Sequence, residues 1–390
     1  MPRALVAWEL GSGLGHAIRT ARIARALEAH GYDVTLAARR PDQCDRILQG
    51  SAVRLLEAPH TTFRQFRTEG RPGLVESMLN QGFLDRDEWL ATSAAWSRLF
   101  AAIRPDILIA DFSATPTMLA HDRMPVLQAG VGYLIPPSGV ADPTGEPPAS
   151  SMELLLANAT EVARATGSHV PREVADLFHG TQHAVCSLSL FDPYQPYRQQ
   201  PVFGPLDPLG PPSTPTGPGI FCYFVAVHPG ALALLQALAS IDLPVEIFMR
   251  EANEEWLAWM RARPNFVVHD RPAPLAEAIA RNAMVVNYGS RGVAEAALAA
   301  GRPQIALLHP HSREQATNAA GLRDVGVANV IDCTEPPTAE AVLRALDDLA
   351  RDTSRLSQAL AVARTVQEEA ASTCLPKIVA ACGGLTGYVQ

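Results

Sequence analysis

The chain has 390 residues, a formal net charge of −8 and a hydrophobic content of 47%. This length exceeds one ordinary hydrophobic core and predicts two domains. The negative charge argues against a nucleic-acid partner, which would need a basic face. No uninterrupted apolar run approaches the roughly 20 residues of a membrane helix, and Glu9 and Gly11 interrupt the apolar start too early for a signal peptide. We therefore expect a cytoplasmic protein without an integral membrane segment.

Cysteine and histidine residues are dispersed along the sequence. None of the six cysteines belongs to a CxxC pair, so we expect reduced thiols and not disulfides or a zinc site. The HPH tract at 309–311 lacks a carboxylate or cysteine at metal-ligand spacing. The DRD tract at 85–87 matches a metal-holding DxD pattern, but its position before Glu88 and Trp89 is more typical of a solvated helix start. The sequence therefore predicts no metal site.

The first elements are a strand, a glycine-rich turn, a helix and a second strand. Their expected ranges are 4–10, 11–16, 17–30 and 34–38. This βαβ opening predicts a parallel, doubly wound α/β sheet with a ligand crevice at the carboxyl ends of its strands. Histidine occupies position 16, where a dinucleotide-binding fingerprint needs glycine, and the second strand ends in Arg39-Arg40 instead of an acidic residue. An NADP-dependent oxidoreductase is therefore a secondary hypothesis.

His16 and Asp111 form the candidate proton-transfer pair. Residues 106–112 read as a buried strand, and its carboxyl end is expected at the same crevice as the glycine turn. An aspartate beside a histidine fixes the tautomer of the imidazole and stabilises its cation after it takes a proton. The alternatives are that His16 only packs or caps a helix, and that Asp111 is the N-cap of the segment 115–121.

A proline-rich segment separates two strand–helix series. Residues 201–219 contain seven prolines and four glycines, which is typical of a linker. The first series continues with strands at 53–58, 125–131 and 184–190 and helices at 88–103 and 152–166. The second contains strands at 221–227, 245–249 and 266–269 and helices at 231–240, 254–261 and 275–281. We expect domains at 1–205 and 220–375, a linker at 206–219, and a C-terminal segment at 376–390 that could pack back on the first domain.

The stretch from Val285 to Asn318 reads as a strand, a glycine turn, a helix, a strand and a polar loop. The turn at 287–292 leads into an alanine-rich helix, which Gly301 and Pro303 terminate. Unpaired backbone N–H groups and the positive end of the helix dipole at such a turn suit a phosphate group. The alternative is an ordinary strand–helix joint.

Several short motifs follow one another in order along almost the whole chain. They are GxGH with GYDVTLA, RPDILIAD, RPNFVV with RPAPL, EAA, GRP, EQ and NA. In this order they resemble glycosyltransferases of the GT-B fold, most closely the nucleotide-sugar-dependent family 1 enzymes. The resemblance implies two Rossmann-like domains that face each other across a cleft. It also implies an inverting, metal-independent transfer of a sugar from a UDP- or dTDP-sugar to a small-molecule hydroxyl, with no cofactor.

The resemblance implies a role for each matching residue. His16 stands where the family keeps its general base, and Asp111 where it keeps the partner of that base. The donor diphosphate is assigned to Asn287, Gly289, Ser290, Arg291 and Gly292, the ribose to Glu295, and the sugar hydroxyls to Glu314 and Gln315. The chain departs from the family at Arg19, where a proline is usual, and at Asn287, Tyr288 and Gly292, which replace a histidine, a glycine and a serine or threonine.

The acceptor pocket is expected in the loops at 60–85 and 132–150. Phe63, Phe66, Phe83 and Tyr133 suggest an apolar or aromatic acceptor, although these side chains could equally belong to the core. Two further alternatives keep the same fold: a sugar-nucleotide epimerase or hydrolase, and a non-catalytic protein that binds nucleotide sugars. The sequence does not specify the acceptor, the sugar, the nucleotide or the oligomeric state.

Overall fold

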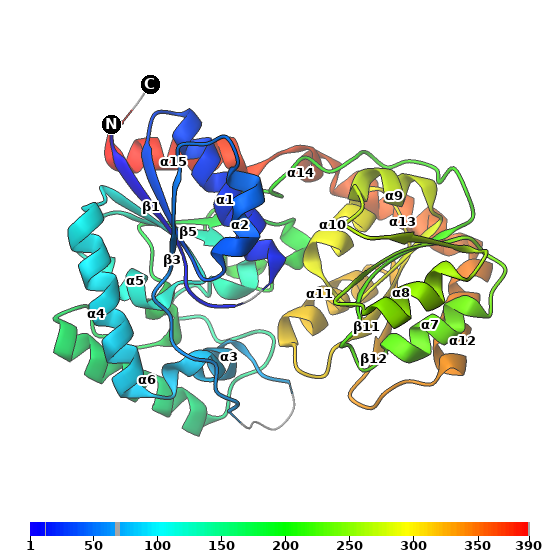
Figure 1. Cartoon of the computed structure of the whole chain (residues 1–390), viewed down its shortest axis with the longest axis horizontal. Coiled ribbons are helices and arrows are strands. Elements are labelled where there is room, and N and C mark those ends of the chain that lie inside the picture. The colour runs from blue at the N-terminus through cyan, green and yellow to red at the C-terminus, as the bar shows by residue number, and fades with distance from the viewer. Residues whose placement is uncertain (12, 67–70, 389–390) are drawn as a thin grey trace. The chain divides into compact units, whose positions relative to one another are not determined.

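The computed structural model describes residues 1–11, 13–66 and 71–388 and divides the chain into two compact units. Unit 1 consists of Met1–Asp207 and Thr373–Gln390, and unit 2 of Pro208–Ser372. Each unit is built on a six-stranded parallel sheet with interleaved helices (Figure 1). The prediction of two Rossmann-like α/β domains is therefore confirmed. No helix in the described ranges is both long and apolar enough to cross a membrane.

The sheet of unit 1 has the strand order β3-β2-β1-β4-β5-β6. Its strands are β1 (Arg3–Trp8), β2 (Asp33–Ala38), β3 (Arg54–Glu57), β4 (Ile107–Asp111), β5 (Val126–Gly130) and β6 (Gln182–Val185). The order changes direction between β1 and β4, where doubly wound sheets bind their ligands. Trp8 pairs with Asp111 in the register of these two strands. The residues that follow β1 and those that end β4 therefore share one edge of the sheet.

The helices of unit 1 cover this sheet. They are α1 (Leu14–Ala29), α2 (Pro41–Leu48), α3 (Leu74–Met78), α4 (Arg86–Ile103), α5 (Ala114–Ala120), α6 (Ala149–Thr166) and α15 (Cys374–Thr386). Asp85 caps α4 because its Oδ1 accepts a hydrogen bond from the Glu88 N–H at 3.0 Å, which confirms the predicted helix start. The C-terminal helix α15 lies beside α1 in Figure 1, and Ile378 and Cys382 are fully buried in the same cluster as Leu27.

One predicted strand of unit 1 is wrong in its second half. The prediction covers 184–190, but β6 ends at Val185 and the chain turns into a short 3₁₀ helix, Ser189–Phe191. The reason is that β6 is an edge strand whose only neighbour, β5, ends at Gly130. Without a neighbouring strand, the residues beyond Cys186 have no ladder to join.

The sheet of unit 2 has the order β12-β11-β10-β7-β8-β9. Its strands are β7 (Ile220–Val225), β8 (Val245–Arg250), β9 (Phe266–His269), β10 (Met284–Asn287), β11 (Gln304–Leu308) and β12 (Ala328–Asp332). Its helices are α7 (Ala231–Ala239), α8 (Glu254–Arg261), α9 (Leu275–Arg281), α10 (Arg291–Ala299), α11 (Arg313–Asp324), α12 (Ala339–Arg351), α13 (Thr353–Thr365) and α14 (Gln367–Ala371). The order reverses between β7 and β10, so the turn after β10 lies at the switch point of this sheet.

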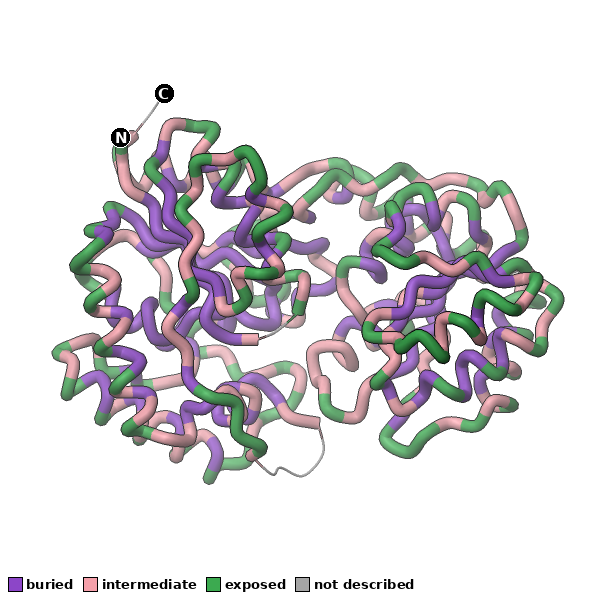
Figure 2. Tube along the Cα trace, viewed as in Figure 1, coloured by how far each residue is buried: buried purple, intermediate pink, exposed green. Residues whose placement is uncertain are grey.

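The cores of both units are formed by the strands and the helix faces that cover them, as the purple segments of Figure 2 show. All six cysteines are buried and form no disulfide, in agreement with the predicted reduced thiols. Arg302 is also fully buried, and its guanidinium donates to the carbonyls of Ser213, Asn282 and Ala300. These bonds attach the proline-rich segment around Ser213 to unit 2.

Candidate functional site

His16 and Asp111 lie together at the carboxyl edge of the unit 1 sheet. Nδ1 of His16 is 3.0 Å from Oδ1 of Asp111, and the Asp111 side chain is 1% exposed. A carboxylate at this distance accepts a hydrogen bond from Nδ1–H, which leaves the lone pair on Nε2. Nε2 is therefore the nitrogen that can take a proton from a ligand.

Two aromatic rings fix the plane of the His16 imidazole. The rings of Trp8 and Phe112 each stack with it, at centroid distances of 5.6 Å and 6.0 Å and interplanar angles of 13° and 19°. Phe112 follows β4 with a positive φ of 45°, and Gly11 follows β1 with a φ of 79°. A Cβ atom on Gly11 would lie 2.8 Å from Nε2 of His16. Glycine at position 11 therefore leaves room for the imidazole.

Arg19 completes this group of charges. Its Nε and Nη2 donate to Oδ2 and Oδ1 of Asp111 at 2.9 Å and 2.8 Å, and Nη2 also lies 3.3 Å from Nδ1 of His16. Burial alone raises the pKa of Asp111, but the charges of Arg19 and His16 and their hydrogen bonds more than offset it, so the pKa lies below its ordinary value. Arg19 thus keeps Asp111 ionised. In the sequence, this contact was indicated by the spacing of three residues between His16 and Arg19, which places both on one face of a helix.

Glu9 is a second buried carboxyl group at the same edge. It is fully buried directly after β1, and its Oε2 accepts a hydrogen bond from the Thr115 N–H at 2.9 Å. Burial raises the pKa of Glu9 to about 7, although Thr115 and Arg39 act in the opposite direction. Its other oxygen has no hydrogen bond among the described residues. A carboxyl group at a strand end, before a glycine turn, was the sequence signal for this residue.

The predicted phosphate-binding turn links β10 to α10 in unit 2. Asn287 is fully buried, its Nδ2 donates to Oε1 of Gln304 at 2.9 Å, and its Oδ1 accepts from the Gly289 N–H at 2.7 Å. Both polar groups of the side chain are therefore engaged within the protein, where they hold the turn in shape. Gly289 has a φ of 78°, and a Cβ atom there would lie 2.8 Å from the Gln315 carbonyl oxygen. This approach requires glycine.

The turn ends at the first residues of helix α10. Ser290 is the N-cap residue but makes no side-chain cap hydrogen bond, and a Cβ atom on Gly292 would meet nothing within 4 Å. Nη1 of Arg291 lies 2.7 Å from Oε2 of Glu295, one helical turn later. The Glu295 side chain is 4% exposed. A positive helix end and an arginine therefore stand beside a buried carboxylate.

Glu314 and Gln315 lie in the first turn of α11, which Ser312 caps through the Gln315 N–H at 3.3 Å. Oε1 of Gln315 is buried and has no hydrogen-bond partner among the described residues. Asn318 on the same helix donates to the Gly289 carbonyl at 3.1 Å. The start of α11 is therefore bound to the turn after β10. Gln315 contributes an unused acceptor there, and a buried acceptor normally has a partner.

Two histidines that the sequence reading did not select also lie at the carboxyl edge of this sheet. His228 follows β7 and His309 follows β11, and their ring centroids are 5.4 Å apart. Burial, and then the neighbouring His309, lower the pKa of His228 to about 4. His228 is therefore neutral at ordinary pH. In the sequence, both residues were indicated by their position shortly after a buried strand.

The four residues predicted for the acceptor pocket have different surroundings. Phe63 is 59% exposed, whereas Phe83 is fully buried against Trp89, with ring centroids 4.0 Å apart. Tyr133 is buried in the same hydrophobic cluster as Phe83, and Phe66 packs against that cluster. Phe83 therefore belongs to the core, which was the stated alternative. Ser12 of the first glycine turn and residues 67–70 of the predicted acceptor loop lie outside the described residues.

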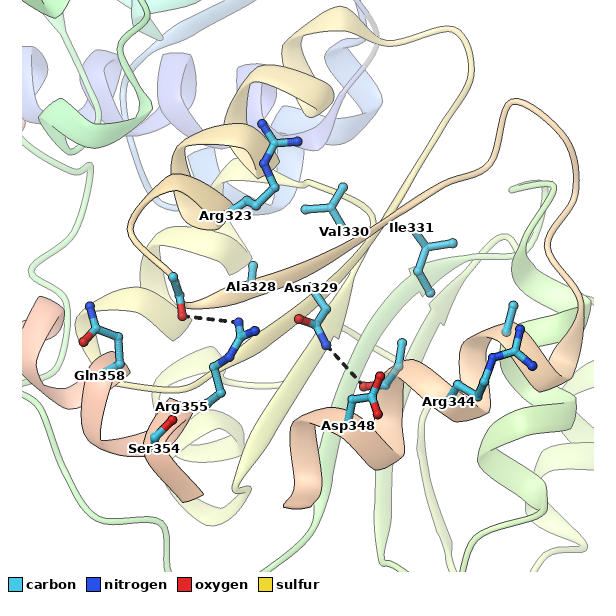
Figure 3. Close-up of a pocket in the computed structure, with 13 residues that line it drawn as sticks. Arg323, Ala328, Asn329, Val330, Ile331, Arg344, Asp348, Ser354, Arg355 and Gln358 are labelled. Atoms are coloured by element: carbon cyan, nitrogen blue, oxygen red, sulfur yellow. Dashed lines mark hydrogen bonds between the residues drawn. The ribbon is translucent and has the colours of Figure 1, made fainter. Parts of the chain in front are cut away.

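A pocket of about 720 Å³ lies along the edge strand β12 (Figure 3). Arg323, Arg344 and Arg355 line it, and Figure 3 shows Asn329 donating to the backbone of α12. Nη1 of Arg355 donates to the Gly326 carbonyl at 3.4 Å. None of the lining residues belongs to the turn at 287–292 or to the start of α11. This pocket is therefore separate from the predicted donor residues.

No protein-family model and no curated protein matches this sequence, but solved structures match over the whole chain. The calicheamicin glycosyltransferase CalG4 gives a TM-score of 0.74 at 16% identity, covering 100% of this chain and 99% of that one. The spinosyn rhamnosyltransferase SpnG, complexed with spinosyn aglycone, gives 0.68 at 18% identity over 98% and 100%. The glycosyltransferase VinC, in complex with dTDP, gives 0.62 at 16% identity over 99% and 100%. The predicted GT-B fold is therefore confirmed.

Proposed function

We propose that this protein is a glycosyltransferase that moves a sugar from a nucleoside-diphosphate sugar to a hydroxyl group of a small molecule. The observation that carries the proposal is the contact between His16 and Asp111, which directs Nε2 away from the carboxylate. The matched structures support it, because CalG4 and SpnG are glycosyltransferases, SpnG holds an aglycone and VinC holds dTDP. We assign the acceptor to unit 1 and the donor to unit 2.

In the proposed reaction, His16 is the general base. Its Nε2 takes the proton of the acceptor hydroxyl while the oxygen attacks the anomeric carbon of the donor. The bond between this carbon and the diphosphate breaks at the same time, and the diphosphate leaves with the electron pair. A single displacement inverts the configuration of the anomeric carbon. Asp111 stabilises the imidazolium, and Arg19 keeps Asp111 ionised throughout.

The donor is proposed to bind at the turn after β10. The backbone N–H groups of Ser290, Arg291 and Gly292 at the start of α10 would face the diphosphate, and the Arg291 side chain would supply a positive charge without a metal ion. Gly289, whose N–H donates to Asn287, would shape the turn around the diphosphate. A direct contact from Asn287 remains a prediction, and its present hydrogen bonds favour a role in shaping the turn. Glu295 accepts hydrogen bonds from the ribose hydroxyls.

The sugar of the donor is proposed to contact the start of α11. The buried Oε1 of Gln315 would accept a hydrogen bond from a sugar hydroxyl, which would satisfy its unused acceptor. Glu314 is half-buried on the preceding position and offers a carboxylate to a second hydroxyl. Phe63, with its exposed ring, remains the proposed contact to an apolar acceptor.

Transfer can be tested by incubating the protein with dTDP- and UDP-sugars and a panel of apolar and aromatic alcohols that includes the spinosyn aglycone. Mass spectrometry would detect the glycosylated acceptor, and a coupled assay would detect the released diphosphate. His16→Ala should lower the transfer rate about 10²–10⁴-fold, since a general base contributes that much. His30→Ala, which removes an exposed histidine at the end of the same helix, is the matched control.

Three outcomes would contradict the proposal. Undiminished transfer by His16→Ala would exclude this histidine as the base. Release of the nucleoside diphosphate without any acceptor would indicate a hydrolase of the same fold, and conversion of the sugar nucleotide into an epimer without release would indicate an epimerase. Acceptor-dependent release separates transfer from both alternatives.

A further inference from the structure

A second cluster of histidines lies at the opposite edge of the unit 1 sheet. His121 is the C-cap of α5 in the connection to β5, and His179 lies in the connection that leads into β6. The amino ends of parallel strands meet at one edge, so these residues lie on the far side of the sheet from Asp111, which ends β4. His169 joins them from the segment that follows α6. The reaction proposed above uses none of these residues.

The side chains of His121, Asp122 and His169 converge closely. One ligand atom of each lies within 4.8 Å of the ligand atoms of the other two. The rings of His121 and His169 stack at a centroid distance of 4.0 Å, and the ring of His179 lies 5.1 Å from His121. His121 and His179 also line a pocket of about 420 Å³, so the cluster is open to solvent on one side.

One polar atom of this cluster has no hydrogen-bond partner among the described residues. Nδ1 of His121 is buried and lies 2.9 Å from Oδ2 of Asp122, but this contact is not a hydrogen bond. A neutral imidazole nitrogen of this kind can bind a metal ion.

We propose that His121, Asp122 and His169 bind a zinc ion, with His179 as the nearest candidate for the fourth ligand. Imidazole nitrogens and one carboxylate are ligands that zinc accepts, at about 2.0–2.2 Å. Such bonds place neighbouring ligand atoms roughly 3–3.5 Å apart and put the ion in the plane of each imidazole. Ligand atoms that now lie up to 4.8 Å apart must therefore approach by about 1.5 Å, and the His169 ring must turn out of its stack on His121. The Asp122 side chain is 84% exposed and can move toward the other ligands. The ion would link the connections before β5 and β6 and after α6.

The opposing charge at this site is Arg123, which follows Asp122 and lines the same pocket. Its Nη2 donates to the Gly167 carbonyl at 3.2 Å, so the guanidinium is held at the end of α6. Asp122 supplies the negative charge among the proposed ligands.

Calorimetric titration of tag-free, chelator-treated protein with zinc chloride would test the site. The expected result is one zinc ion per chain at this site and a raised melting temperature with zinc but not with magnesium, which prefers oxygen ligands. His169→Ala and Asp122→Asn should each weaken zinc binding by at least about tenfold, because loss of even an outer-shell partner costs 10–100-fold. Asparagine tolerates the positive φ of 60° at position 122, so this variant should keep the fold.

His311→Ala is the matched control, since it removes a histidine from the His309–His311 pair of unit 2. Zinc binding should be unchanged in this variant. The proposal is wrong if the protein binds no zinc, or if Asp122→Asn and His169→Ala bind it as tightly as the unmodified protein does. Loss of binding only in His311→Ala would place the zinc in unit 2 and would equally overturn it. The titration contains no nucleotide, so its result is independent of the proposed transferase activity.

Discussion

The carboxyl edges of the two sheets carry different kinds of polar groups. In unit 1 the edge holds side chains that are paired with one another, namely His16, Arg19 and Asp111. In unit 2 it holds a glycine turn, a neutral His228 and the Oε1 of Gln315, which has no hydrogen-bond partner among the described residues. The first set has the groups of the proposed proton transfer, and the second has those of the proposed donor site.

Both edges also contain a glycine with positive φ beside a site residue, but the surroundings differ. A Cβ atom on Gly11 would meet the far end of the His16 side chain, which could yield only by leaving Asp111 and its neighbouring rings. A Cβ atom on Gly289 would meet the backbone of Gln315, which cannot move without displacing α11. The turn of unit 2 is therefore the less tolerant of the two.

The largest expected effect concerns the buried carboxyl group of Glu9, at the carboxyl edge of the unit 1 sheet. Its folded-state pKa is raised from 4.5 to about 7, so the folded protein binds the proton more tightly than the unfolded chain does. The stability contributed by this proton is complete below about pH 4.5 and is lost as the pH rises to about 7. Glu9→Gln cannot ionise. It should therefore gain about 3 kcal/mol relative to the unmodified protein between pH 4.5 and pH 8.

Urea denaturation at pH 4.5, 6 and 8 would measure this change for both proteins. Glu153→Gln, which replaces an exposed carboxylate on α6, should follow the unmodified protein at every pH. Parallel pH curves for Glu9→Gln and the unmodified protein would show that Glu9 is not held in its neutral form.

The glycines of unit 2 give a matched pair of substitutions. Gly289→Ala places a Cβ atom against the Gln315 backbone at positive φ, and the backbone conformation alone costs about 1–2 kcal/mol. We expect dTDP or UDP binding to weaken at least about tenfold in isothermal titration. Gly292→Ala meets nothing within 4 Å and should bind normally. Equal affinities of the two variants would mean that the shape of the turn does not matter for the donor.

The smallest expected effect concerns Arg19. Arg19→Met leaves the negative charge of Asp111 to His16 alone, which favours the protonated imidazole and removes the base. The acid limb of the pH profile of kcat/KM should therefore move upward by about one pH unit. Arg19→Lys keeps the positive charge without the bidentate contact, so its pH profile should lie closer to that of the unmodified protein. Arg22→Met is the control: it removes the exposed ion pair with Asp207 and should leave the acid limb of the profile unchanged. An acid limb that does not move in Arg19→Met would exclude the proposed role of Arg19.

The predicted ends of the strands were sufficient to place His16 near Asp111 and to locate the turn after β10. They could not show that Glu9 and Arg19 are buried, because burial of a charge depends on packing against distant segments such as Thr115 and Asp111. The sequence could not show that the Asn287 side chain is hydrogen-bonded to Gln304, since that contact forms only when β10 and β11 pair.

Two other features also depend on contacts that the sequence does not reveal. The histidines at 121, 169 and 179 come from separate connections, and no sequence spacing indicates that they meet. The residue type alone did not show whether Phe83 belongs to the core or lines a pocket, because a phenylalanine is common in both places.

The central claim is that unit 2 binds a nucleoside diphosphate while His16 of unit 1 performs the proton transfer. Calorimetric titration of dTDP and UDP into the unmodified protein, His16→Ala and Glu295→Gln tests it most directly. We predict that His16→Ala binds the preferred diphosphate as tightly as the unmodified protein. Glu295→Gln should bind at least about tenfold more weakly, since hydrogen bonds to a charged group contribute about 1.5–3 kcal/mol. Unchanged affinity in Glu295→Gln together with lost binding in His16→Ala would contradict the account.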